Sequence, residues 1–112
     1  MWNFNDVQID IDILDADAAL RIEQALDVLA VEEKQLPKEG KLSEVVTAYC
    51  SMYIRFFDTV LGPGGAKLVF QGKTNVRLCD EAYASFIAHI QKETRELDRR
   101  RVAFMRKYAP KK

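Results

Sequence analysis

The sequence predicts one mainly α-helical domain, with three helices, an N-terminal β-strand and a long, basic C-terminal helix. Three observations predict this class. Apolar residues recur at helical spacing through most of the chain, a strict alternation is confined to its start, and most glycines and prolines fall at two breaks, residues 37–40 and 62–65. The 112 residues are enough for one modest core, and their 48% apolar and 30% charged content is typical of a globular protein.

The first 14 residues predict a β-strand. Apolar and polar residues alternate strictly from position 7 to position 13, with Val7, Ile9, Ile11 and Ile13 on one face and Gln8, Asp10 and Asp12 on the other. The apolar face should cover the core, and the acidic face should be exposed. Because a lone strand leaves backbone groups unpaired, we expect it to pair with residues 66–71, to lie at a sheet edge or to meet a strand of another copy.

The first helix is expected to begin at a cap formed by Asp15 or Asp17 and to end before Pro37. Its core stripe consists of Ala19, Ile22, Leu26 and Leu29. Residues 37–41 then form a polar loop.

The second helix is expected to begin at Ser43 and to end at the glycines that start with Gly62. Its apolar stripe is wider than one neighbouring helix requires and consists of Val46, Tyr49, Cys50, Tyr53, Phe56, Phe57, Val60 and Leu61. We therefore expect most of the stripe to be core and a part of it to meet a partner. Residues 66–70 fit either one helical turn or a short strand.

The last helix is expected to begin at a cap formed by Thr74 or Asn75 and to span residues 76–108. A helix of 33 residues is about 50 Å long, which exceeds the width of a domain of this size. Residues 92–112 should therefore project from the core or lie against a partner. Pro110 and the lysines that follow it should be frayed.

The charges are unevenly distributed along the chain. Residues 1–33 hold nine acids and one base, a net charge of −8, and residues 92–112 hold nine bases and three acids, a net charge of +6. Such polarity favours head-to-tail attraction between copies or within a chain. Two well-solvated ends are an equally good explanation.

No group of residues in the sequence indicates catalysis, a metal site or a cofactor. Cys50 and Cys79 lie among apolar neighbours, where a free cysteine acts as a small buried side chain, and His89 is the only histidine. The run from Gly62 to Lys67 follows a helix and lacks the hydroxyl residue of a phosphate-binding loop, which favours a turn. We therefore expect a protein that is not an enzyme.

The chain has no apolar run of the length that a membrane span needs. Its first residues lack the basic start and the apolar stretch of a signal peptide. We expect a cytoplasmic protein that makes no contact with a membrane.

The middle of the chain resembles a group of small proteins encoded among the tail genes of siphophages and prophages of Gram-positive bacteria. The resemblance covers residues 56–87 and, more loosely, the whole chain. It rests on Phe56-Phe57-Asp58, Val60-Leu61-Gly62, Gly64, Lys67-Leu68-Val69-Phe70, Gly72-Lys73-Thr74-Asn75-Val76-Arg77-Leu78-Cys79, Glu81-Ala82-Tyr83 and Phe86-Ile87. Tyr108-Ala109-Pro110 is similar to the turn before the basic end of those proteins.

This resemblance implies another small tail-morphogenesis protein or, as we expect here, a tail assembly chaperone of the bacterial host's cytoplasm. Such a protein binds the tape-measure protein, or another tail protein, and keeps it soluble during tail morphogenesis. A compact helical protein with an aromatic face, which self-associates, would suit that role. We predict that the client's helices bind Tyr49, Tyr53 and Phe57. We also predict a homo-oligomer in which Arg99, Arg100 and Arg101 meet the acidic N-terminal part of another copy.

Two alternatives remain open. One is a structural component of the virion, such as a tail completion protein. The other is a small nucleic-acid-associated phage protein that uses the basic last helix. Nucleic acid is the less favoured partner, because consecutive arginines point in different directions around a helix.

Overall fold

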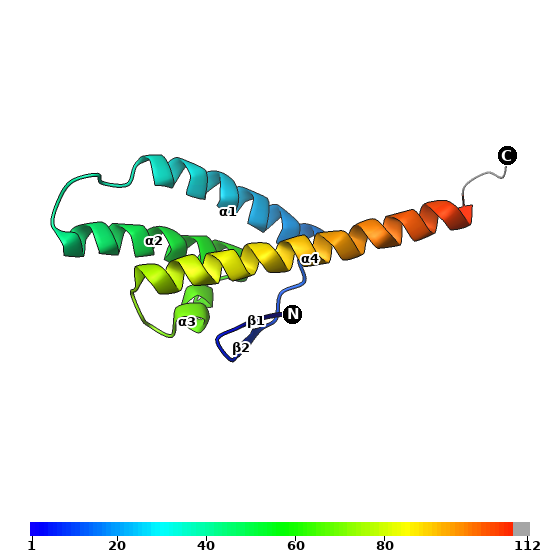
Figure 1. Ribbon diagram of the computed structural model, residues 1–112, viewed down its shortest axis with the longest axis horizontal. Helices are drawn as coiled ribbons and strands as arrows, with labels where there is room; N and C mark the ends of the chain where they lie inside the picture. Colours follow the sequence, from blue (N-terminus) through cyan, green and yellow to red (C-terminus); the bar gives the residue numbers. More distant parts are fainter. Residues whose placement is uncertain (109–112) are drawn as a thin grey trace.

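The computed structural model describes residues 1–108, which form two strands and four helices (Figure 1). In chain order the elements are β1 (Trp2–Phe4), β2 (Val7–Ile9), α1 (Ala16–Lys34), α2 (Leu42–Leu61), α3 (Gly65–Phe70) and α4 (Val76–Tyr108). The mainly α-helical class with an N-terminal β element is confirmed. Pro110 and the two lysines after it, for which we predicted a frayed end, lie outside the described residues.

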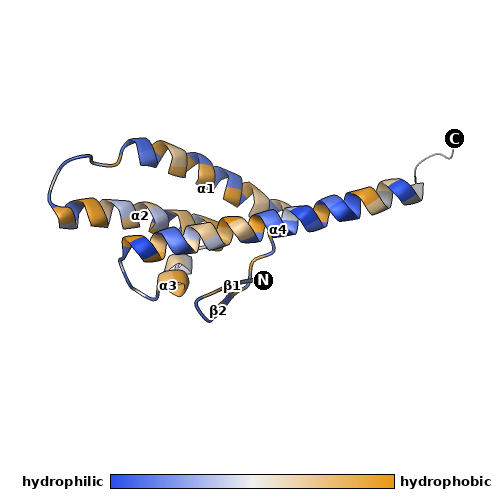
Figure 2. Cartoon of the chain, in the orientation of Figure 1, coloured by the Kyte–Doolittle hydropathy of each residue, from blue (hydrophilic) through white to orange (hydrophobic). Residues whose placement is uncertain are grey.

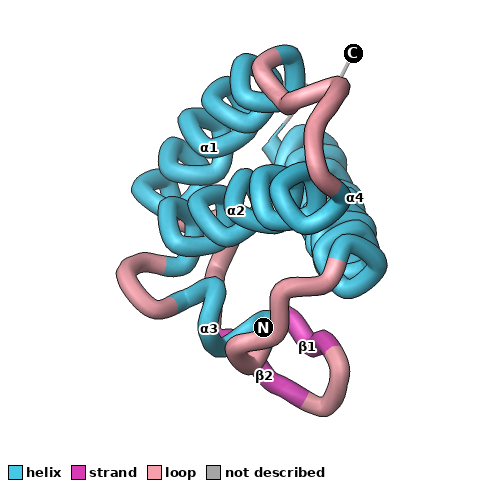
Figure 3. The backbone as a smooth tube through the Cα atoms, turned by 90° about the vertical axis from the view of Figure 1, so that its left-hand side faces the viewer, coloured by secondary structure: helices cyan, strands magenta, loops and turns pink. Residues whose placement is uncertain are grey.

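Helix α2 is the central element of the fold. It packs against α1 on one side and against α3 and α4 on the other, as the view along the long axis shows (Figure 3). The β-hairpin completes the core through contacts of β1 with α4 and of β2 with α3. With neighbours on several sides, α2 needs the wide apolar stripe that the sequence contains.

The N-terminal strand pairs with a segment that we did not predict. β1 and β2 form an antiparallel hairpin in which Trp2 lies opposite Ile9 and Phe4 lies opposite Val7. Asn5 and Asp6 connect the strands with positive φ angles of 46° and 64°, as the central residues of a type I′ turn do. Of the three arrangements that we considered for the strand, pairing with residues 66–71 is wrong, because those residues form α3 and its C-terminal cap.

The strand that we predicted over residues 1–14 is also shorter than expected. Its second half leaves the sheet after β2, although burial continues to alternate, with Ile11 and Ile13 buried and Asp12 exposed. The backbone turns here because Asp12 accepts hydrogen bonds from two backbone N–H groups that follow it, one to its carboxylate at 3.0 Å and one to its carbonyl at 3.1 Å. The apolar side chains thus reach the core without a strand partner.

Most of the predicted helix ends are confirmed. Asp15 caps α1 by accepting a backbone hydrogen bond of 3.2 Å in its first turn, and Asn75 accepts one of 3.1 Å in the first turn of α4. Gly62 follows the last residue of α2 with a φ of 95°, a conformation that favours glycine. The predicted cap at Ser43 is wrong: the residue before α2 is Lys41, which makes no side-chain capping bond, and Ser43 lies within the first turn.

Residues 62–64 form a turn, as predicted, and the turn returns α3 closely against α2. A Cβ atom on the buried Gly65 would overlap the side chain of Leu61 and lie 3.0 Å from the carbonyl oxygen of Phe57. The carboxylate of Asp58 accepts a hydrogen bond of 2.9 Å from the backbone N–H of Ala66. A glycine and a carboxylate therefore fix the short helix on its longer neighbour.

Trp2 lies at the centre of an aromatic core. Its ring stacks on Phe57, with 5.6 Å between ring centroids and 9° between ring planes, and lies 4.9 Å from the ring of Phe86. Its Nε1 donates a hydrogen bond of 3.0 Å to the hydroxyl of Ser85, which satisfies the indole N–H. One side chain from the hairpin thus connects α2 and α4.

Helix α4 extends far beyond the rest of the domain. The molecule measures 67 × 30 × 21 Å. Its longest dimension exceeds the others because the C-terminal part of α4 continues beyond the packed elements (Figure 1). We call residues 91–108 the arm. Its surface is mostly hydrophilic with scattered hydrophobic positions (Figure 2), and the side chains that the structure describes there are exposed or half-buried. The predicted projection of this helix end is therefore seen in the structure.

Candidate protein-binding surfaces

Two of the three aromatic residues that we predicted to bind a client are buried in the core. Phe57 is 0% exposed, and Trp2, Phe70 and Phe86 surround its ring. Tyr53 is 6% exposed and lies 5.3 Å from the ring of Tyr83. The prediction that these two side chains bind a client is corrected, because in this structure they are not accessible. The hairpin and α4 cover the part of α2 on which they lie.

The third aromatic residue, Tyr49, is half-buried at the seam between α2 and α4. Its hydroxyl donates a hydrogen bond to the carboxylate of Asp80. Burial, and then this hydrogen bond, raises the pKa of Tyr49, so that the hydroxyl remains a donor. Tyr49 therefore joins the two helices and is only partly accessible to a partner.

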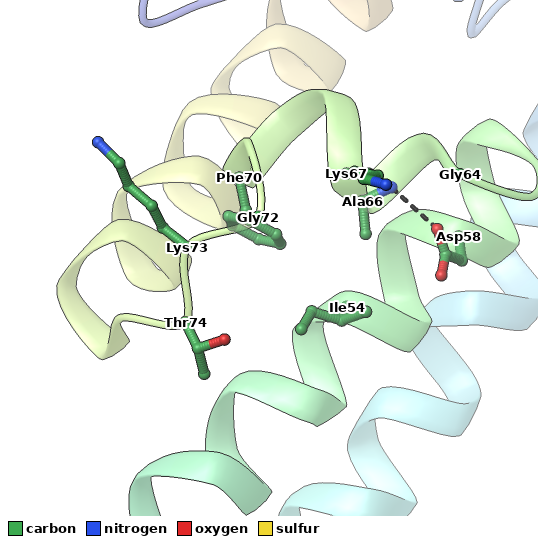
Figure 4. A pocket seen from close by; sticks show the side chains of 9 residues that line it. All are labelled: Ile54, Asp58, Gly64, Ala66, Lys67, Phe70, Gly72, Lys73 and Thr74. Atoms are coloured by element: carbon green, nitrogen blue, oxygen red, sulfur yellow. Dashed lines mark hydrogen bonds between the residues drawn. The ribbon is translucent and has the colours of Figure 1, made fainter.

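A groove lies between α2 and α3 (Figure 4), and its α2 side is formed by Ile54 and Asp58, which are not part of the predicted stripe. The groove has a volume of about 320 Å³. Half-buried Ile54 of α2 faces the α3 side of the groove, where Ala66 and Phe70, which are almost fully buried, form the apolar floor. Such a space is large enough for one or two apolar side chains of another molecule.

The rim of the groove is positively charged. Lys67 and Lys73 line it and are exposed, whereas the carboxylate of Asp58 is engaged by the backbone of Ala66. Leu68 adds an exposed apolar side chain next to Lys67 on α3. An apolar floor with basic neighbours fits an amphipathic segment that carries acidic residues beside its apolar ones.

The arm presents the three arginines that we predicted to meet a partner. Arg99, Arg100 and Arg101 are exposed, and they point to different sides of the helix. Arg99 pairs with Glu96 at 2.9 Å and Arg101 approaches Asp98 at 3.8 Å, both within one turn. Exposed pairs of this kind contribute little to stability, so these arginines remain available to a stronger partner.

The outer face of α1 is a surface that the sequence analysis missed. Ala18, Ile22, Ala25 and Leu29 form its buried face, whereas Leu20 and Val31 are exposed on the opposite side and Val28 is exposed at the edge of that side, beside α2. The signal was present in the sequence: these three residues share one helical face outside the core stripe, at spacings of eight and three. Helix α1 is thus apolar on two sides.

The thiols and the imidazole show no arrangement for nucleophilic chemistry. Cys50 and Cys79 are buried and free, and burial, together with the neighbouring Cys50, raises the pKa of Cys79 to about 12. Burial lowers the pKa of His89, whose Nε2 is buried without a hydrogen-bond partner among the described residues. Within residues 1–108, no three metal-ligating side chains come together.

None of the helices that the structure describes has both the length and the apolar character that would let it cross a membrane.

Comparison with known proteins identifies a family without assigning an activity. A family model described as a family of unknown function (DUF6673) matches residues 5–112, and the chain belongs to this family. No curated protein and no solved structure matches the chain. The match begins within the hairpin turn and includes α1 to α4, so the groove, the arm and the outer face of α1 all lie inside it.

Proposed function

We propose that this member of the DUF6673 family is a phage or prophage tail assembly chaperone that binds and solubilises the tape-measure protein. The observation that carries the proposal is the groove between α2 and α3, which lies in the stretch that resembles tail-region proteins. Of the nine residues that line it, eight fall within residues 56–87. The residues of the resemblance therefore line a surface groove as well as contributing to the core.

The groove supports a specific mode of client binding. An amphipathic helix of the client would place an apolar side chain between Ile54 and Phe70 and acidic side chains near Lys67 and Lys73. Leu68, which is 58% exposed, would extend the apolar contact beyond the groove. A shallow groove with few polar contacts can accept many different helices, as a protein that coats a long client must do.

Co-expression with the tape-measure protein encoded in the same gene region would test the proposal. We expect the client to stay in the soluble fraction with this chain and to become insoluble without it. A variant with Leu68→Asp, Lys67→Glu and Lys73→Glu should lose the client, because it reverses the charge of the rim and removes the exposed apolar contact. Pull-down and light scattering of the eluate would give the stoichiometry.

A matched control is Leu42→Asp, which changes an apolar residue that is 80% exposed at the start of α2 and does not line the groove. This variant should keep the client soluble. A client that is insoluble with the unmodified chain would overturn the proposed function. A groove variant that works as well as the control would overturn the binding mode.

The exposed arginines of the arm favour a second candidate function, non-specific binding of nucleic acid. Binding by phosphate contacts falls steeply as salt rises. A fluorescence titration with duplex DNA from low to moderate salt would show such a loss of affinity if the arm has this function. No binding at low salt would exclude it.

A further inference from the structure

Helix α1 presents a second apolar face to the surroundings. Leu20, Val28 and Val31 are 53%, 54% and 55% exposed. At 100° per residue they fall within an arc of about 80°, with Leu20 and Val31 away from the buried face and Val28 at the edge beside α2. This arrangement is unexpected for a helix that packs mainly against one neighbour, α2, since a helix at a domain surface usually keeps that side polar.

The same face of α1 is acidic. Asp17, Glu23 and Asp27 are exposed on or beside it. The whole helix, from Ala16 to Lys34, holds five acids and two bases, a net charge of −3. Among the described residues, none of these three acids forms an ion pair.

The arm has the complementary pattern. Leu97, Val102 and Met105 are exposed apolar residues on it. They are surrounded by bases, and residues 92–106 hold six bases and three acids, a net charge of +3. Leu97 and Met105 are eight residues apart, as Leu20 and Val28 are on α1, and eight residues span about 12 Å on any helix.

We infer that the arm of one molecule docks lengthwise on the outer face of α1 of a second copy. Leu97 and Met105 of the first molecule would cover Leu20 and Val28 of the second, and Arg101, which falls between Leu97 and Met105 on the same helical face, would lie near Glu23 and Asp27. One molecule cannot make this contact with itself, because its arm runs away from its own α1 (Figure 1). The contact does not involve the groove, so it does not depend on the proposed client.

The two surfaces in this contact are different, so it is a head-to-tail contact. Each molecule carries one donor surface, the arm, and one acceptor surface, α1. Such contacts build a ring if the rotation between copies closes and a filament if it does not. They also make a mixing experiment possible, because a molecule that has lost one surface retains the other.

Two variants separate the two surfaces. The arm variant carries Leu97→Asp and Met105→Asp, and the α1 variant carries Leu20→Asp and Val28→Asp. All four residues are exposed, so folding should be retained, as circular dichroism would check. Light scattering over a concentration series should show a mass that rises with concentration for the unmodified chain and the mass of a monomer for each variant.

An equimolar mixture of the two variants is the decisive sample. The intact arm of the α1 variant can bind the intact α1 of the arm variant, and no further copy can be added. We expect the mixture to have twice the monomer mass. A mixture that stays monomeric overturns the inference, as does an unmodified chain that stays monomeric at every concentration.

Charge is tested separately with Arg99→Glu, Arg100→Glu and Arg101→Glu in one chain. We expect self-association to weaken about tenfold or more, and association of the unmodified chain to weaken as salt rises. The matched control is Leu42→Asp with Leu68→Asp, two exposed apolar residues outside both surfaces, which should associate as the unmodified chain does. If the charge-reversed variant lost DNA binding but associated normally, the arginines would serve nucleic acid, and this part of the inference would fail.

Discussion

The two parts of α4 belong to one continuous helix but have different environments. In residues 76–90 the helix buries Cys79, Ala82 and Phe86 against its neighbours, whereas in the arm the structure describes no buried side chain. The first part is therefore stabilised by packing. The arm depends on helix-favouring residues and on pairs such as Glu96 with Arg99, whose effects are small. Packing therefore predicts that stability is concentrated in the first part, and it leaves the described side chains of the arm exposed or half-buried.

The largest contrast should come from truncating one apolar residue in each part. Phe86→Ala removes a ring that is 0% exposed and contacts Trp2, Phe56 and Phe57, so it should lower the free energy of unfolding by about 3–5 kcal/mol. Leu97→Ala, at a residue that is 41% exposed, should change it by less than about 0.5 kcal/mol. Urea unfolding at a concentration that keeps the protein monomeric would measure both. Equal losses would contradict the division of α4 into two parts.

A smaller effect is expected at the start of α4, where the packed part begins. Asn75→Ala removes the side-chain acceptor for the backbone N–H of Leu78, and we expect a loss of about 1 kcal/mol in the free energy of unfolding. Thr74→Ala is the matched control, because the neighbouring hydroxyl makes no such capping bond in the structure. Denaturant midpoints that shifted equally for the two variants would show that Asn75 is not the cap.

The smallest effect should appear at His89, near the end of the packed part, as a dependence of stability on pH. Burial lowers the pKa of this imidazole below its ordinary value of 6.5, although the neighbouring Glu93 opposes the shift. The folded protein then binds fewer protons than the unfolded chain, so the contribution of His89 is fully present above pH 6.5 and is lost as the pH falls through the folded pKa. Unfolding curves from pH 7.5 to pH 5.5 should therefore show declining stability.

The control for that series is His89→Gln, which keeps a polar side chain without a titration in this range. Its stability should decline less over the same pH window. A parallel decline in both proteins would assign the effect to other groups.

The helices were predictable from the sequence because their signals are local. Asp15 and Asn75 cap the helices that follow them, Gly62 ends α2, and the length of α4 alone required a projecting end. The hairpin was not predictable in the same way. Its strands have three residues each, and its turn uses Asn5 and Asp6 without the glycine that usually marks such a turn.

The errors at the candidate site have one physical cause. Periodicity shows which face of a helix is apolar, but not how many neighbours cover it. The neighbours of α2 on several sides bury Tyr53 and Phe57, whereas α1 packs mainly against α2 and leaves Leu20 and Val28 exposed. The arginines of the arm were placed correctly at the surface, because no apolar stripe of sufficient width accompanies them.

Helix α4 is one continuous helix from the core to the arm. The direction in which the side chains of the arm point therefore depends on the number of residues between the arm and the core. Each inserted or deleted residue between residue 90 and residue 97 would rotate the tip by about 100° relative to the core and shift it by about 1.5 Å. A change of seven residues would nearly restore the angular phase, whereas a change of two would turn the apolar side chains to the opposite side. If the arm binds through its apolar side chains, its length can therefore change only by steps, such as seven residues, that keep those side chains on the same side of the helix.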